Sequence, residues 1–87
     1  MRVENMTSNS SGREVANQFT IQDGGKEYFQ SYHSIIVMIE KGQVTLDRKK
    51  WDFSVTTGKY RNQFLGESKK ETEAKIKSGE YKLADLN

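Results

Sequence analysis

Histidine, cysteine and paired carboxylates are the side chains that most often carry catalysis or hold a metal, and this 87-residue chain offers few of them. His33 is the single histidine and cysteine is absent, so a site with several histidine or thiolate ligands is excluded. The carboxylates occur mainly singly or opposite lysines, a pattern that does not favour a carboxylate metal site. We therefore expect no metal and no cofactor. We interpret His33, beside Ser34 at the start of an apolar segment, as an edge or partly buried residue.

Two motifs of catalytic and nucleotide-binding proteins are incomplete in this sequence. Lys59 follows Gly58 as in a phosphate-binding loop, but the upstream glycine is missing and Tyr60 stands where a Ser or Thr would hold magnesium. No Gly-x-Ser-x-Gly elbow is present, so a triad of serine, His33 and an acid lacks the turn that would position its nucleophile. The sequence therefore predicts a protein that is not an enzyme.

The strongest local pattern is a run of basic and aromatic side chains over residues 48–61. This segment contains five Lys or Arg and one Asp, whereas residues 1–47 contain four Lys or Arg and six Asp or Glu. The positive excess of the chain therefore lies in residues 48–61. Basic groups can hold phosphates while a ring stacks on a base, and Trp, Tyr and Arg are also enriched in protein interfaces. The structural alternative is that Trp51 and Phe53 fill the core while residues 48–50 form a solvated charge run protecting a strand end.

A second aromatic group consists of Tyr28, Phe29 and Tyr32. Three large rings within five residues cannot all face one side of a core, so at least one should be exposed. Exposed tyrosines beside a sheet are common contact residues, and we combine them with the basic segment. The candidate residues for binding a partner protein or nucleic acid are Tyr28, Tyr32, Arg48, Lys49, Lys50, Lys59 and Arg61.

Length and composition place these residues in one small domain. Charged residues make up 30% of the chain, and no apolar run approaches the roughly 20 residues that a membrane span requires. The first residues have no apolar core of a secretory signal, so we expect a cytoplasmic protein without membrane contact. Residues 1–13 combine Ser, Asn, Thr and Gly without apolar periodicity. They predict a disordered tail, followed by a single domain over residues 14–87.

Alternation of apolar and polar residues predicts strands in the first half of this domain. Residues 15–22 alternate before turn residues at 23–25, and residues 34–39 form a compact apolar run. A two-residue turn at Lys41–Gly42 would fix the next hairpin. Its predicted pairs are Ile39 with Val44, Val37 with Leu46, Ile35 with Arg48, Met38 with Thr45 and Ile36 with Asp47. These segments predict a small antiparallel sheet of three to four strands.

The second half of the chain predicts two short helices packed on one face of this sheet, which makes the fold class α+β. The predicted helices cover residues 56–65 and 68–78, with caps at Ser54, Thr56 or Thr57, at Gly66, at Ser68–Glu71 and at Gly79. The predicted core is Val37, Ile39, Val44, Leu46, Trp51, Phe53, Tyr60 and Phe64. Such a core offsets chain entropy only narrowly, so a second copy of the chain or another partner would add stability.

The segment from Trp51 to Glu67 (WDFSVTTGKYRNQFLGE), with residues 75–81 and the closing residues 83–87, resembles a group of small phage and prophage accessory proteins without an established function. The resemblance covers about the last 55 residues, beginning near Tyr32. That group has no catalytic motif, so no functional residue is carried over. The resemblance implies non-catalytic binding to a macromolecular machine of a bacterial host, such as inhibition of a nuclease, a polymerase or a CRISPR complex. A small basic nucleic-acid-binding protein is the alternative.

Overall fold

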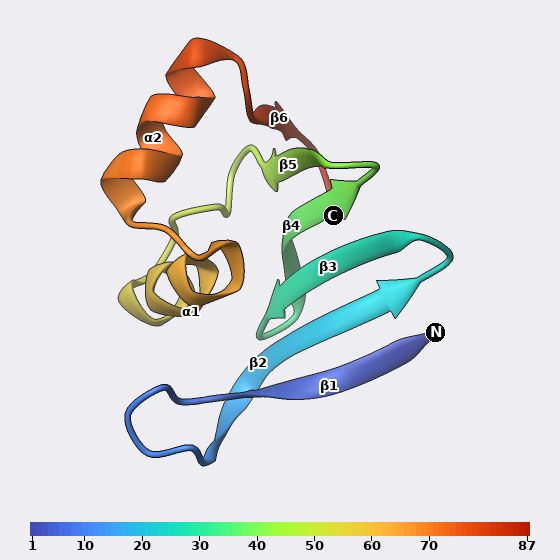
Figure 1. The fold of residues 1–87 in the computed structure, drawn as a ribbon, viewed down its shortest axis with the longest axis vertical. Helices are drawn as coiled ribbons and strands as arrows, with labels where there is room; N and C mark the ends of the chain where they lie inside the picture. Colours follow the sequence, from blue (N-terminus) through green and yellow to red (C-terminus); the bar gives the residue numbers. More distant parts are fainter.

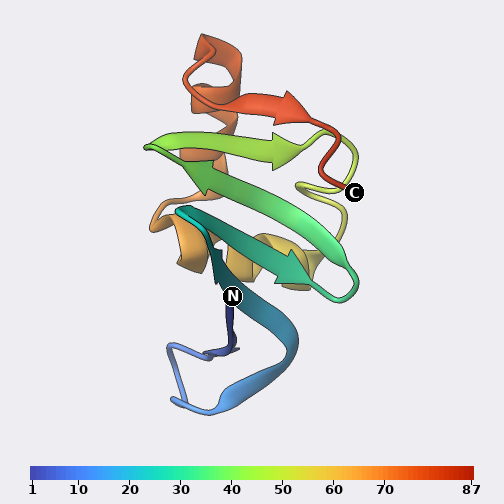
Figure 2. The same ribbon diagram turned by 90° about the vertical axis from the view of Figure 1, so that its right-hand side faces the viewer.

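The computed structural model describes all residues from 1 to 87 and contains one six-stranded sheet with two helices on one side (Figures 1 and 2). The elements are β1 Arg2–Thr7, β2 Glu14–Asp23, β3 Lys26–Ser31, β4 Ser34–Glu40, β5 Gln43–Asp47, α1 Val55–Leu65, α2 Lys69–Ser78 and β6 Lys82–Ala84. Neighbouring strands follow chain order and are antiparallel, except that β6 pairs in parallel with β5. The α+β class is confirmed, but the sheet has six strands, more than the sequence predicts.

The N-terminal segment was predicted to be a disordered tail, but it is ordered in the structure. Residues 2–7 form β1, which pairs antiparallel with β2, and Met6 is only 7% exposed within the core. Strand pairing satisfies backbone groups, and the burial of Met6 adds apolar contact that the polar composition of this segment conceals. The connection that follows is also closed, because the Gly12 amide donates to the Ser8 carbonyl at 2.8 Å. The predicted tail over residues 1–13 is therefore corrected to an edge strand and a turn.

The hairpin of β4 and β5 confirms three of the five predicted pairs. They are Ile39 with Val44, Val37 with Leu46 and Met38 with Thr45. Lys41 and Gly42 both have positive φ, as the two-residue turn with the twist of a hairpin requires. The other two pairs are wrong, because the pairing of β4 with β5 ends at Val37 and Leu46. A register shift between β3 and β4 next to Phe29 also leaves Ile36 without an opposite residue in β3. Ile36 turns into the core instead, where it is fully buried.

Both helices begin and end where their caps predict. The Ser54 hydroxyl accepts a hydrogen bond from the Thr57 amide at the start of α1, and Gly66 ends this helix in the left-handed region. At α2, Ser68 and Glu71 form both hydrogen bonds of a capping box. Neither helix is long and apolar enough to cross a lipid bilayer.

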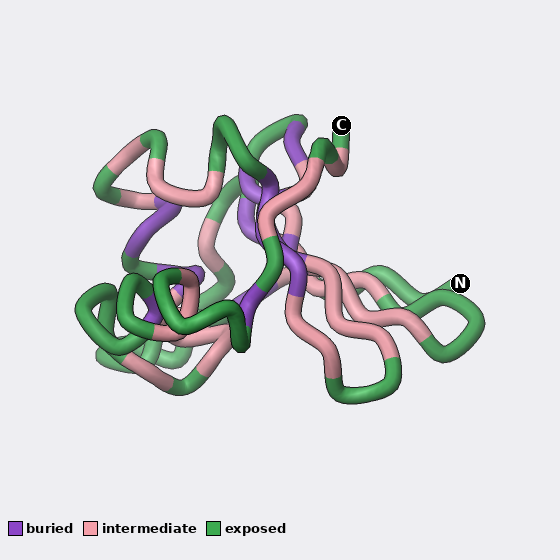
Figure 3. Tube along the Cα trace, turned by 90° about the horizontal axis from the view of Figure 1, so that it is seen from above, coloured by how far each residue is buried: buried purple, intermediate pink, exposed green.

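The core lies between α1, α2 and one face of the sheet, where the buried segments in Figure 3 gather. Phe29 of β3 is fully buried and stacks on Phe64 of α1, with ring centroids 5.7 Å apart. Of the predicted core residues, Val37, Leu46 and Tyr60 are buried, and Ile39, Val44, Trp51 and Phe64 pack against the core while partly buried. The prediction is wrong for Phe53, which is 47% exposed, whereas Arg61 is fully buried and donates to the Trp51 carbonyl in the same loop.

Candidate functional site

Arg61, predicted as a contact residue, is fully buried and holds the loop before α1 against that helix. Its Nη1 donates to the Trp51 carbonyl at 2.7 Å and to Asp52 Oδ1 at 3.1 Å, and its Nη2 donates to Asn62 Oδ1 at 3.0 Å. Asp52 also accepts from Lys69 Nζ at 2.6 Å. Burial opposes ionisation of Asp52, but the two cations keep its pKa below the ordinary range. Arg61 is therefore a structural residue, and its prediction as a direct contact residue is wrong.

The other basic candidates remain on the surface, and two of them are engaged within the chain. Arg48 Nη1 lies 3.7 Å from Asp85, and Lys50 Nζ donates to the Ser34 hydroxyl at 3.0 Å. The Lys49 side chain is exposed, and so is Lys59, whose Nζ lies 5.5 Å from the centroid of its neighbouring tyrosine ring. Trp51 packs against the core, so the basic run does not carry an exposed tryptophan for stacking.

Three exposed hydrophobic side chains lie at one end of the molecule, and we call them the apolar rim: Tyr32, Phe53 and Val55. Their exposed fractions are 40%, 47% and 91%. Tyr32 lies in the turn between β3 and β4, whereas the other two come from the start of α1 and the loop before it. The turn and the helix are tied together, because the hydroxyls of Ser31 and Thr57 share a buried hydrogen bond of 2.9 Å.

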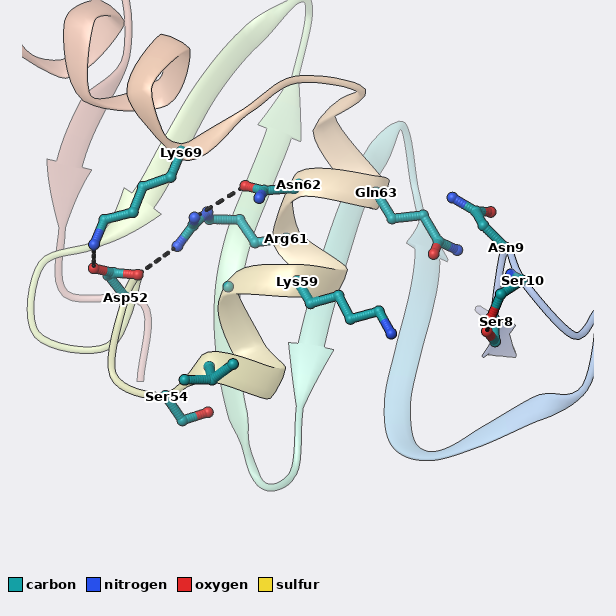
Figure 4. Close-up of a pocket in the computed structure, with 12 residues that line it drawn as sticks. Ser8, Asn9, Ser10, Asp52, Ser54, Lys59, Arg61, Asn62, Gln63 and Lys69 are labelled. Carbon is teal, nitrogen blue, oxygen red and sulfur yellow. Dashed lines mark hydrogen bonds and ion pairs between the residues drawn. The ribbon is translucent and has the colours of Figure 1, made fainter.

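A polar groove of about 930 Å³ follows the outer side of α1 from the apolar rim toward the connection between β1 and β2 (Figure 4). Its lining residues are Ser8, Asn9, Ser10, Asp52, Ser54, Val55, Gly58, Lys59, Arg61, Asn62, Gln63 and Lys69. Gln63 Nε2 donates to the Thr7 carbonyl at 2.8 Å and so connects the far wall to the helix. Val55 belongs to both the rim and the groove, which makes them one continuous surface.

This surface offers binding groups and few catalytic ones. Asp52 is the one carboxylate in the groove, and both its oxygens are held by cations. His33 is exposed in the turn between β3 and β4, and no hydrogen bond joins its ring to another side chain. No group of three or more histidine or carboxylate side chains that could hold a metal ion occurs in the structure. The arrangement can therefore bind apolar and polar groups side by side.

Tyr28, the remaining predicted contact residue, lies on the face of the sheet that the helices leave uncovered. It follows from the register that Tyr28 points away from Phe29, its neighbour in β3, which packs against α1. Val3, Ile21, Tyr28 and Met38 lie opposite one another in a row across four strands, with Phe19 and Ile35 on the same face. We call these six residues the open-face cluster. Sequence reasoning found Tyr28 but missed the cluster, because its members come from strands whose register was not predicted.

Neither Tyr28 nor Tyr32 lines the groove, but Tyr32 lies in the turn that the Ser31–Thr57 hydrogen bond ties to α1. The apolar rim thus unites one predicted contact residue with Phe53, which was predicted in the core, and with Val55, which sequence reasoning did not single out. A lone valine at the start of a helix has no pattern that marks it as a contact residue. Its signal is its exposure, which appears only in the folded chain.

Comparison with protein-family models matches residues 1–80 to a family of unknown function, DUF8033. The matched region includes β1, both helices and the whole groove. No curated protein and no solved structure matches the chain. Because the match covers more than half of the sequence, the chain belongs to the DUF8033 family.

Proposed function

We propose that this protein acts by binding another protein without catalysing a reaction, and that it does so through the apolar rim and the adjoining groove. The observation that carries the proposal is the exposure of Val55, at 91%, where the rim meets the groove. Protein interfaces commonly combine a small apolar centre with a polar surround. The rim supplies the first, and the serine, asparagine and lysine side chains of the groove supply the second.

The properties of Val55 in the free protein support this proposal. A β-branched residue has a low helix propensity, and acidic residues or proline are favoured in the first helical turn. An exposed valine there adds neither packing nor helix stability. A contact with a partner gives this side chain a physical role that the isolated fold does not.

The expected partner is a component of a macromolecular machine in a bacterial host, as the resemblance to phage accessory proteins implies. Nucleic acid is the competing partner, since Lys49 and Lys59 are exposed. It is the weaker candidate, because Arg61 is buried and Trp51 packs against the core. Phe53 is the one exposed ring within the basic segment, with Lys50 Nζ 5.8 Å from its centroid, so base stacking would depend on this single ring.

The test is affinity capture from bacterial lysate with the tagged protein, in the presence and absence of nuclease, analysed by mass spectrometry. We compare the unchanged chain with Val55→Asp and with Ala74→Asp, a matched control that places the same charge on the exposed side of α2. The expected result is a protein partner that resists nuclease, is retained by Ala74→Asp and is lost with Val55→Asp. Partners that disappear with nuclease, or that Val55→Asp retains, would contradict the proposal.

A further inference from the structure

The open-face cluster lies on a sheet face that no helix or strand covers, and the C-terminal residues reach this face only at β5, where the Leu86 amide donates to Asp47 Oδ1 at 2.8 Å. An antiparallel sheet that is covered on one side normally alternates apolar residues inward with polar residues outward. Here five apolar side chains of the cluster are only partly exposed and yet pack against no part of the core, and Val3 is 55% exposed. Figure 2 shows both helices behind the sheet, with no element in front of β3 to β6. The middle of this face is therefore apolar, with polar residues around it.

We infer that a second copy of this chain covers the open face, so that two sheets stack face to face about a two-fold axis. The inference does not depend on the proposed function, because the cluster and the groove lie on opposite sides of the sheet. In such an isologous contact the same patch serves both copies, so it must tolerate its own charge.

The charges around the cluster meet this condition. Asp23, Lys26 and Glu40 lie opposite one another on the open face, and Lys82 lies at its other end. Two acidic and two basic groups leave no net charge to repel a second copy. Asp47 has the same orientation in β5 but is 4% exposed, and it accepts hydrogen bonds from the amides of Lys50 and Leu86. Its carboxylate is therefore solvated by the chain's own amides and is withdrawn from the surface that a second copy would contact.

The size of the face also suits a dimer. Six strands spaced by about 4.8 Å, each contributing about five residues of about 3.3 Å, give a face of roughly 29 by 17 Å. Two such faces present at most about 1,000 Å² in total, because Thr45 and Asp47 of β5 are already buried within each chain, and this is near the lower limit for a specific interface. A dimer through this face would also stabilise the fold, since only 16 of 87 residues are buried and small domains commonly gain stability from oligomers.

The first measurement is the mass in solution, by sedimentation equilibrium at protein concentrations up to a few hundred micromolar. The chain has a mass of 10.0 kDa, so the expected particle has twice that mass. Ile21→Lys, which places a charge in the cluster, should return the protein to the single-chain mass, whereas Val55→Asp should leave the dimer intact. A single-chain mass for the unchanged protein, or a dimer that persists in Ile21→Lys, would overturn the inference.

A second measurement remains informative if Ile21→Lys fails to fold. The chain contains no cysteine, so a single introduced thiol reports on one contact. Met38→Cys lies near the middle of the face, where a two-fold axis brings each residue close to its own copy, and mild oxidation should yield a disulfide-linked dimer. Ala74→Cys, exposed on α2, is the control and should remain a single chain. Equal cross-linking of the two variants, or none in Met38→Cys, would overturn the inference.

Discussion

The two faces of the sheet carry similar apolar residues, but only one of them is covered. Phe29 and Tyr28 are neighbours in β3. Phe29 is fully buried beneath α1, whereas Tyr28 remains partly exposed on the other side. Burial in this protein is therefore decided by what lies above a residue and not by its type. The covered face holds the fold together, and the open face keeps apolar surface for a second molecule.

The largest expected effect on stability comes from truncating the two neighbouring aromatic residues of β3, one on each face of the sheet. Phe29→Ala removes a fully buried ring that stacks on Phe64, and it should lower the free energy of unfolding by about 3–5 kcal/mol. Tyr28→Ala should cost about 1 kcal/mol or less in dilute protein, because its ring is not part of the core. Urea unfolding at two protein concentrations measures both. Only the Tyr28→Ala loss should increase with concentration, and equal losses in dilute protein would show that both faces support the fold.

The next effect concerns the polar interior on the covered side. Arg61→Ala removes a buried cation that donates to the Trp51 carbonyl and to Asp52, and it should cost about 3 kcal/mol. Lys69→Ala removes the other cation bound to Asp52, but the lysine side chain is 52% exposed and screened by water, so its loss should cost much less than that of Arg61. Urea unfolding compares the two variants. Equal losses of unfolding free energy would mean that burial does not make the Arg61–Asp52 ion pair more stabilising than the exposed Lys69–Asp52 pair.

Acid should weaken the fold through its least exposed carboxylates. Burial opposes ionisation of Asp47, Asp52 and Glu67, but the pKa of each carboxyl lies below its ordinary value, held there by hydrogen bonds at Asp47 and by hydrogen bonds and nearby cations at Asp52 and Glu67. A group with a lowered pKa in the folded state stabilises the fold above its unfolded pKa, about 4, and this contribution is lost as the pH falls through the folded pKa. Stability should therefore be level from pH 7 to 5 and decrease below about pH 4.

Glu67→Gln offers the sharpest check of this pH dependence. The Glu67 carboxylate accepts from Thr72 Oγ1 at 2.6 Å, Lys75 Nζ at 2.7 Å and the Tyr81 hydroxyl at 2.9 Å. The amide variant cannot titrate, so its unfolding free energy should be lower at pH 7 and should change less between pH 5 and 3. Glu73→Gln, exposed on α2, is the control. A slope in Glu67→Gln as steep as in the unchanged protein would contradict this role of the carboxylate.

The parts of the fold that depend on neighbouring residues were predictable from the sequence. The capping box at Ser68–Glu71, the glycines after both helices and the turn at Lys41–Gly42 each result from local hydrogen bonding or from a required positive φ. The strands β1 and β6 were not predictable in this way. Polar residues dominate β1, and β6 has three residues that pair in parallel with β5, so both depend on partners distant in sequence.

The same distinction applies to the candidate site. The exposure of Tyr32 follows from crowded aromatic residues, a local property. The burial of Arg61 depends on a carbonyl ten residues earlier and on the fold of the loop that presents it. A basic residue next to aromatic residues has the same sequence pattern whether it contacts a partner or supports the loop that does. Sequence reasoning could therefore identify the segment that forms the site, but not which of its side chains are accessible.

The smallest expected effect on stability belongs to the residue with the largest expected effect on binding. Val55 contributes almost no packing, and α1 has no acidic residue in its first turn. Val55→Asp should therefore stabilise the free protein by about 0.5 kcal/mol, because a carboxylate interacts favourably with the amino end of a helix. Val55→Lys should change the unfolding free energy by a similar amount in the opposite direction, and urea unfolding in low salt measures the difference. A loss above about 1 kcal/mol in Val55→Asp would show that this valine serves the fold. A stable Val55→Asp protein that no longer retains its partner would separate the binding surface from the core that supports it.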